Sequence, residues 1–248
     1  MLRYLVSSFA LLGVLAAGAC GEDDRDSLTV SAAASLKTAF SAYGEDFDAA
    51  AARFSFAASD ELAAQIRAGA RPDVYAAAND KLPRALFDDG LVERPVAFAS
   101  NRLVLAVPAP DARVSALSDL AGPGITIAVG APTVPVGGYT RTVLARLPAD
   151  QRRAILANVR SQEPDVAGVV GKVAQGAVDA GFVYVTDVAA SDGRLKAIEL
   201  PSALRPDVVY AAAVVTGTPN RRAARAFVDG LVDGPGARRL RDAGFGAP

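Results

Sequence analysis

The sequence has no His, no Trp and a single Cys among its 248 residues. Without His it cannot form a Ser-His-Asp or Cys-His nucleophilic site, a His-ligated zinc or haem centre, or an imidazole general base. Its 26 Lys and Arg residues are scattered and balanced by 27 Asp and Glu residues, so a nucleic-acid surface is not expected. Six Tyr and no Trp also disfavour stacking platforms for sugars or bases. What remains is a folded chain that is 51% hydrophobic and rich in Ala.

The first residues are typical of a targeting segment rather than of a folded element. Arg3 precedes an apolar stretch from Tyr4 to Leu15, which is short for a membrane span, and small residues follow it up to Cys20. The run LAAGAC is similar to the box of bacterial lipoproteins, in which the Cys becomes the lipidated first residue. We expect a lipoprotein signal peptide at 1–19, a lipid anchor on Cys20 and a tether at 20–27. The alternative is an ordinary signal peptide with an unmodified Cys.

Strand-like and helix-like segments alternate along the rest of the chain. The apolar residues Leu36, Ala39, Phe40, Tyr43 and Phe47 follow the spacing of one face of an amphipathic helix. Strands are expected at 28–32, 54–57, 73–77, 102–108, 125–130, 180–185 and 208–215, with helices between them and two helices after the last strand. This alternation is typical of an α/β fold with crossover connections.

Proline-flanked positions near residues 107 and 207 are the places where the chain would pass between two lobes. We therefore expect one lobe from residues 28–107 together with 208–248, and a second lobe from residues 108–207. In two-lobed α/β proteins a ligand binds in the cleft between the lobes. The predicted architecture is accordingly two α/β lobes around one site.

Motifs of common enzyme chemistry are weak in this sequence. The run GVVGKV at 168–173 has two residues between its glycines where a Walker A loop has four, and Val173 replaces the magnesium-binding Ser or Thr. Adjacent acids such as Asp88 and Asp89 are typical of solvated loops, and no pattern places two carboxylates across a pocket. We expect no catalytic residue, no cofactor and no metal ion bound by the protein, so that the chain is not an enzyme.

A different element recurs: a strand that runs into a helix through small residues. Ser35 opens the first long helix and Ser59 opens the second, and each is most simply read as an N-cap. The runs VPVGGY at 134–139 and PDVAG at 164–168 add two more helix starts with small residues. Four helix N-termini facing one cleft would supply free N–H donors and partial positive charge, which suits an anion.

Several runs in the chain resemble one family. In order, they are VSAAASLKTAF, FAASDELAAQIRAGARPDVYAAAND, IAVGAPTVPVGGYTRTVL, DVAGVVGKVAQGAVDAGFVYVTD and VVYAAAVV. Together they are similar to the molybdate-binding proteins of bacterial ABC importers, from about Leu28 to the C-terminal AGFG. The resemblance implies a two-lobed class II periplasmic-binding-protein fold with the ligand in the cleft between lobes.

The resemblance also implies a set of oxyanion-binding residues, all of them neutral donors. The hydroxyl donors are the Ser in AAASL (Ser35), the Ser in FAAS (Ser59) and the Tyr that ends FVY (Tyr184). The backbone amide donors are Val136 in VPVG and Val166, which follows Asp in PDV. A fully deprotonated dianion has only acceptor oxygens, so a site made of donors matches it, whereas monohydrogen phosphate carries a proton that needs an acceptor.

Three neighbours of these residues have their own expected roles. Asp60 follows Ser59 in the first turn of a helix, and we expect its carboxylate to point to solvent, because turned inward it would repel an anion. Asp165 is most simply an N-cap that leaves the next amides free. Tyr184 has an alternative reading as a half-buried strand tyrosine with no ligand.

Taken together, these patterns predict an exported solute-binding protein that closes two lobes over molybdate or tungstate and delivers it to the membrane permease of an ABC importer. It would be a monomer, lipid-anchored to the outer face of the cytoplasmic membrane or periplasmic, and would bind no nucleic acid. The alternatives are a receptor for sulfate or phosphate on the same fold, an anchored enzyme with carboxylate chemistry, and a surface module without a small ligand.

Overall fold

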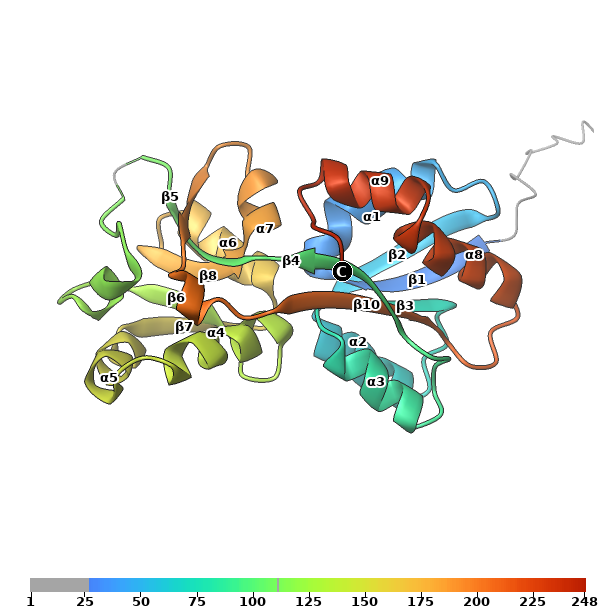
Figure 1. The fold of residues 1–248 in the computed structure, drawn as a ribbon, viewed down its shortest axis with the longest axis horizontal. Coiled ribbons are helices and arrows are strands. Elements are labelled where there is room, and N and C mark those ends of the chain that lie inside the picture. Colours follow the sequence, from blue (N-terminus) through green and yellow to red (C-terminus); the bar gives the residue numbers. More distant parts are fainter. Residues whose placement is uncertain (1–26, 111) are drawn as a thin grey trace, which may run out of the picture.

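The computed structural model describes residues 27–110 and 112–248. The expected signal peptide, Cys20 and the part of the tether before Ser27 lie outside these residues. Within them the chain forms two five-stranded sheets with helices on both faces, which lie side by side as two lobes (Figure 1). The predicted two-lobed α/β architecture is therefore confirmed. None of the helices in this part of the chain has the length and apolar character that a membrane crossing requires.

The first lobe is built on a sheet with the strand order β2-β1-β3-β10-β4. β1 pairs in parallel with β2 and β3, whereas β10 runs antiparallel to β3 and β4. The strands are β1 (Ser27–Ala33), β2 (Ala51–Ala57), β3 (Val74–Ala77), β4 (Val96–Asn101) and β10 (Val208–Val214). The helices are η1 (Ala34–Leu36, a 3₁₀ turn), α1 (Lys37–Glu45), α2 (Ser59–Arg67), α3 (Lys81–Asp88), α8 (Arg221–Val232) and α9 (Pro235–Asp242).

Apolar residues at helical spacing hold this lobe together. In Figure 1, α1, α8 and α9 lie on one face of the sheet and α2 and α3 lie on the other. The periodicity predicted for α1 places Phe40 and Tyr43 in the core, where the Phe40 ring meets Phe227 of α8 edge to face at a centroid distance of 5.6 Å. Such pairs add to the stabilisation that comes from burying apolar surface.

The second lobe is built on a sheet with the strand order β7-β6-β8-β5-β9. β6 pairs in parallel with β7 and β8, and β5 runs antiparallel to β8 and β9. The strands are β5 (Leu103–Pro108), β6 (Ile127–Gly130), β7 (Val159–Glu163), β8 (Ala180–Tyr184) and β9 (Leu195–Glu199). The helices are η2 (Leu117–Ala121), α4 (Pro135–Ala145), α5 (Ala149–Ala157), α6 (Val166–Ala174), α7 (Val185–Ala189) and η3 (Ser202–Leu204).

The first passage between the lobes lies earlier in the chain than predicted. Residues 103–107 were expected in the first lobe, but β5 pairs with β8 and β9 and so belongs to the second sheet. The chain therefore crosses between Asn101, the last residue of β4, and Leu103. Pro108 is the last residue of β5 instead of marking the crossing, and a proline has no N–H to donate to a continuing ladder. The second passage leads into β10, which lies beside β4 in the middle of the molecule (Figure 1).

Candidate functional site

The carboxyl ends of the parallel strands in both sheets open into one pocket between the lobes. Its cavity volume is about 20 Å³, which is far below the roughly 300–1,000 Å³ of pockets for drug-sized ligands. All five predicted site residues line this pocket. The full lining is Ala33, Ala34, Ser35, Ala57, Ala58, Ser59, Ala78, Val134, Pro135, Val136, Asp165, Val166 and Tyr184. This position follows the general rule that open α/β sheets bind ligands beyond the carboxyl ends of their strands.

The first lobe contributes two serines, and neither of them caps its helix. Ser35 lies within η1 directly after β1, and its Oγ is 2.9 Å from the hydroxyl oxygen of Tyr210. Ser59 is the first residue of α2, and its Oγ accepts a hydrogen bond from the backbone N–H of Ala78 at 3.1 Å. The simple reading of both residues as N-caps is therefore wrong, since neither helix start has a side-chain cap.

The second lobe contributes two helix N-termini. Val136 is the second residue of α4, where Pro135 occupies the first helical turn and has no N–H to satisfy. Val166 is the first residue of α6. Asp165 precedes it as the N-cap, and its Oδ1 accepts from the N–H of Gly168 at 2.8 Å, as predicted. The first amides of a helix have no carbonyl of their own helix to reach, so these two starts present donors to the pocket.

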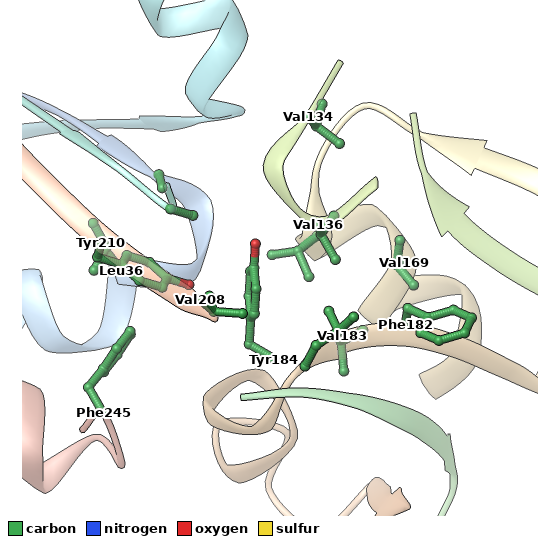
Figure 2. Packing of buried hydrophobic residues seen from close by; sticks show 14 of the residues in the cluster. Leu36, Val134, Val136, Val169, Phe182, Val183, Tyr184, Val208, Tyr210 and Phe245 are labelled. Atoms are coloured by element: carbon green, nitrogen blue, oxygen red, sulfur yellow. The ribbon is translucent and has the colours of Figure 1, made fainter. Parts of the chain in front are cut away.

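Tyr184 ends β8 and stands between the two lobes. Figure 2 shows its ring between Val136 on one side and Tyr210 on the other, with the hydroxyl at the open end. The side chain is 1% exposed, and its hydroxyl oxygen is buried without a hydrogen-bond partner among the described residues. This burial differs from the alternative reading of a half-buried strand tyrosine. Desolvation raises the pKa of Tyr184 well above its ordinary value, so the group remains a neutral donor at physiological pH.

The pocket is lined by neutral groups with one exception. Its described lining contains no Lys or Arg, and the single acid, Asp165, is engaged by its own helix. Hydroxyl donors, helix N-termini and a buried phenol all present the positive end of a dipole, which stabilises an anion without a counter-ion. A small anion with acceptor oxygens on several sides fits this arrangement.

Comparison with known proteins gives the family. Residues 28–246 match the family model described as bacterial extracellular solute-binding protein. The chain belongs to this family. The molybdate-binding protein ModA of Mycobacterium tuberculosis is 34% identical to this solute-binding protein over 258 residues, covering 98% of this chain and 97% of ModA. The resemblance inferred from the motifs is thereby confirmed.

Solved structures share the fold of this solute-binding protein. The periplasmic molybdate-binding protein of Azotobacter vinelandii superposes with a TM-score of 0.78 at 24% identity, covering 89% of this chain and 99% of that protein. The sulfate-binding protein SubI of Mycobacterium tuberculosis has the same TM-score at 17% identity, covering 89% of this chain and 86% of that one. The fold alone therefore accommodates receptors for different oxyanions.

One expectation about the solute-binding protein is wrong. Asp60 does not simply face solvent: the residue is half-buried, and its Oδ1 is buried without a hydrogen-bond partner in the described residues. Burial, and secondarily the negative charge of Asp60, raises the pKa of the Tyr75 hydroxyl, which donates to the Ser59 carbonyl at 2.7 Å. One oxygen of the Asp60 carboxylate is thus buried near Tyr75, and Asp60 is not part of the pocket lining.

Sequence reasoning also missed a second layer of polar residues behind the pocket. Tyr210 in β10 and Asn101 at the end of β4 are buried and lie within hydrogen-bond distance of each other, and Tyr210 contacts Ser35. Asp187 in α7 accepts from the N–H of Tyr184 at 2.8 Å. The sequence did hold a signal for Asp187: an acid three residues after the end of a strand is typical of the third position of a helix, where it accepts from the backbone N–H of the N-cap residue. Tyr210 stands in the continuous apolar run of a buried strand, which indicates burial and not a polar contact.

Proposed function

We propose that this solute-binding protein captures molybdate, or the chemically similar tungstate, outside the cytoplasm and delivers it to the membrane permease of an ABC importer. The observation that carries the proposal is the convergence of five donor residues from four helix starts and one strand end on one small pocket. ModA, which is 34% identical over nearly the whole chain, supports the choice of ligand.

The donors have separate roles in this proposal. The hydroxyls of Ser35 and Ser59 and the phenol of Tyr184 donate to oxygens of the tetrahedral ion, and the amides of Val136 and Val166 supply backbone donors from the second lobe. Hydrogen bonds to a charged acceptor are stronger than bonds between neutral groups, so five of them can hold a dianion without Lys or Arg. The buried hydroxyl of Tyr184 has no hydrogen-bond partner among the described residues, which supports its role, because a ligand oxygen in the pocket would supply that partner.

The two lobes would close over the ligand, because its hydrogen-bond donors come from both of them. Ser35 and Ser59 come from the first lobe, whereas Val136, Val166 and Tyr184 come from the second. A ligand that contacts both sets stabilises the closed arrangement over an open one, and the two passages between the lobes are the hinge. We further propose that the protein acts as a monomer without enzymatic activity, and that a lipid on Cys20 holds it at the outer face of the cytoplasmic membrane.

Thermal unfolding tests this function. The purified protein is heated with molybdate, tungstate, sulfate or phosphate, each added separately. A ligand at about a thousand times its dissociation constant stabilises the folded state by roughly 4 kcal/mol, which for a chain of this size raises the midpoint by roughly 8–16 °C. We expect a shift of this size with molybdate and tungstate and little shift with phosphate. A sulfate shift as large as that of molybdate would favour the sulfate-receptor alternative.

A double variant tests whether molybdate binds in the proposed pocket. Ser59→Ala combined with Tyr184→Phe removes two of the five donors, and we expect molybdate affinity in a calorimetric titration to fall at least about a hundredfold. Ser41→Ala combined with Tyr43→Phe makes the same chemical changes on α1, outside the pocket lining, and should leave the affinity unchanged. Unchanged affinity in the pocket variant would refute the proposed site.

A further inference from the structure

A buried polar network lies behind Ser35, where the two passages between the lobes meet. The Tyr210 hydroxyl is 2.9 Å from Ser35 Oγ and 3.5 Å from Asn101 Nδ2, and Asn101 Nδ2 donates to Thr186 Oγ1 at 2.9 Å. Tyr210 is fully buried, and Asn101 and Thr186 are 8% and 5% exposed. The network therefore joins a site residue of the first lobe to α7 of the second lobe through β10 and β4.

The direction of each hydrogen bond in this network follows from its fixed members. The backbone N–H of Arg102 donates to Asn101 Oδ1 at 2.8 Å, and a backbone N–H can only donate. The amide oxygen of Asn101 therefore faces Arg102, and its NH₂ group faces Tyr210, where it can only donate. Within 3.5 Å the Tyr210 hydroxyl has these two neighbours in the described residues, and of the two Ser35 Oγ is the one that can accept its proton.

The proton of Ser35 is consequently directed elsewhere. Because Ser35 Oγ accepts from Tyr210, its own O–H is free to donate, and Ser35 lines the pocket. Ser59, which also lines the pocket, accepts a hydrogen bond as well, but from a backbone group instead of a side chain. Its Oγ accepts from the backbone N–H of Ala78, so its proton is also free for the pocket. In both serines a hydrogen bond from behind therefore leaves the hydroxyl proton available to the pocket.

We propose that Tyr210, oriented by Asn101, is a positioning residue that biases Ser35 toward donating into the pocket and thereby contributes to the preference for a fully deprotonated oxyanion over a protonated one. This inference rests on the proposed function. A serine hydroxyl that is free to rotate can either donate or accept, so it tolerates a ligand O–H. When Tyr210 occupies one of the two lone pairs of Ser35 Oγ from behind, the proton is the group most readily turned to the pocket, so the P–OH of phosphate finds an acceptor there less readily.

A double-variant cycle tests the inference. Calorimetric titration with sodium molybdate is performed on the wild-type protein, Ser35→Ala, Tyr210→Phe and the double variant. Tyr210→Phe retains the ring that packs against Phe98, Tyr184 and Phe245 and removes the hydroxyl. We expect it to lower molybdate affinity about three- to tenfold. Because Tyr210 acts through Ser35, the double variant should bind no more weakly than Ser35→Ala alone.

A specificity measurement separates this role from a structural one. The concentration of phosphate at pH 7 that displaces molybdate is measured by competition. In Tyr210→Phe the ratio of phosphate to molybdate dissociation constants should fall, because the Ser35 hydroxyl is no longer biased toward donation and accepts from the P–OH more readily. Asn101→Ala should shift the ratio in the same direction. It replaces Tyr210→Phe in this measurement if Tyr210→Phe does not fold. Tyr43→Phe, which removes a buried hydroxyl that donates to the Phe227 carbonyl, should leave the ratio unchanged.

The outcomes distinguish the two proposals. If Ser35→Ala leaves molybdate affinity unchanged, the proposed site itself fails, and this inference fails with it. If Ser35→Ala weakens binding but Tyr210→Phe does not, only the positioning role is overturned. Additive losses in the double variant, or an unchanged ratio for phosphate and molybdate in both Tyr210→Phe and Asn101→Ala, also overturn it.

Discussion

Tyr184 combines two properties that are in conflict in the absence of a ligand. Its ring is part of the core between the lobes, but its hydroxyl is buried without a hydrogen-bond partner in the described structure. A hydroxyl without a partner inside the protein adds no intramolecular hydrogen bond to stability, which is ordinarily worth about 1 kcal/mol. The residue therefore offers the pocket a donor that is already in place.

Tyr184→Phe should consequently lower affinity without lowering stability. We expect the ligand-free variant to be at least as stable as the wild type in urea denaturation, because no hydrogen bond within the described protein is lost. Its molybdate affinity should fall about ten- to a hundredfold, the usual value of a hydrogen bond to a charged group. Tyr43→Phe is the matched control: its hydroxyl donates to the Phe227 carbonyl at 3.1 Å, so its loss should cost about 1 kcal/mol of stability without affecting binding. A Tyr184→Phe protein that is clearly less stable than the wild type would contradict this account.

The residues that sequence could predict are those with a local pattern. Ser35, Ser59, Val136 and Val166 lie at junctions between strand and helix, where small residues mark the turn, and all four line the pocket. Tyr210 contacts Ser35 across 175 positions of the chain, so no local sequence pattern predicts this contact. The orientation of Asp60 was mispredicted because a first-turn acid is ordinarily solvated, and the packing of α2 against Tyr75 overrides that preference.

Among the elements, α4 depends on two adjacent glycines with different surroundings. A Cβ on Gly137 would lie 1.9 Å from the carbonyl oxygen of Ala131, a contact that the backbone must relieve by moving. A Cβ on Gly138 would meet nothing within 4 Å. The close approach at Gly137 lets the start of α4, including Val136, pack directly on the loop that follows β6.

Gly137→Ala and Gly138→Ala therefore form a matched pair. We expect Gly137→Ala to lower the free energy of unfolding by about 1–3 kcal/mol through overpacking, and to weaken molybdate binding because the amide of Val136 is displaced. Gly138→Ala should raise stability by about 0.5–1 kcal/mol, since a helical Gly is replaced without a clash. Chemical denaturation and calorimetric titration measure both effects, and equal behaviour of the two variants would refute the packing argument.

The first turn of α7 holds a titratable group that makes stability depend on pH. Burial raises the pKa of Asp187 to about 7, with a further contribution from the charge of Asp165, although the N–H of Tyr184 opposes the shift. The folded state then retains a proton on Asp187 that the unfolded chain has already lost. This carboxyl consequently contributes a loss of stability as pH rises from about 4 to about 7, and the loss is complete above that range.

Asp187→Asn should abolish this contribution. The difference in unfolding free energy between the variant and the wild type should grow with pH over this window, by at most about 1.4 kcal/mol per pH unit, and then level off. The difference is the useful quantity, because Asp119 and Asp179 have lowered pKa values and change stability in the opposite direction in both proteins. Urea denaturation at several pH values between 4 and 8 measures it, and a constant difference would show that Asp187 does not titrate in this range.

The strands that sequence reasoning missed share a position. β4, β7 and β9 each lie at the edge of a sheet, and their residues are mostly half-buried or exposed. An edge strand such as VRSQE in β7 has neither the apolar run of a central strand nor a clean alternation. Central strands such as β5 and β10, which are buried on both faces, were predicted from their continuous apolar runs.

At the scale of the whole molecule, the alternation of strands and helices predicted two lobes, and the structure confirms them. The position of the first passage was not predictable from prolines alone, because Pro108 closes β5 inside the second lobe. What decides the passage is the pairing of β5 with β8 and β9, which is a property of the assembled sheet. One continuous core of buried residues extends through both lobes, so we expect the described body to unfold as a cooperative unit.

The neutral lining of the pocket has a consequence for the conditions in which the protein works. Ionic screening weakens attraction between separated charges, with a Debye length of about 10 Å at 0.1 M salt, but it acts weakly on dipoles in direct contact with a buried ion. The described lining contains no Lys or Arg, and the chain has 26 basic and 27 acidic residues, so little long-range attraction exists to be screened. Molybdate affinity should therefore change less than about threefold between dilute buffer and roughly 0.5 M sodium chloride, as titrations at both salt concentrations would show. A site built around Arg or Lys would lose affinity over the same range of salt concentration. This protein would instead bind its ligand with similar affinity at low and high ionic strength.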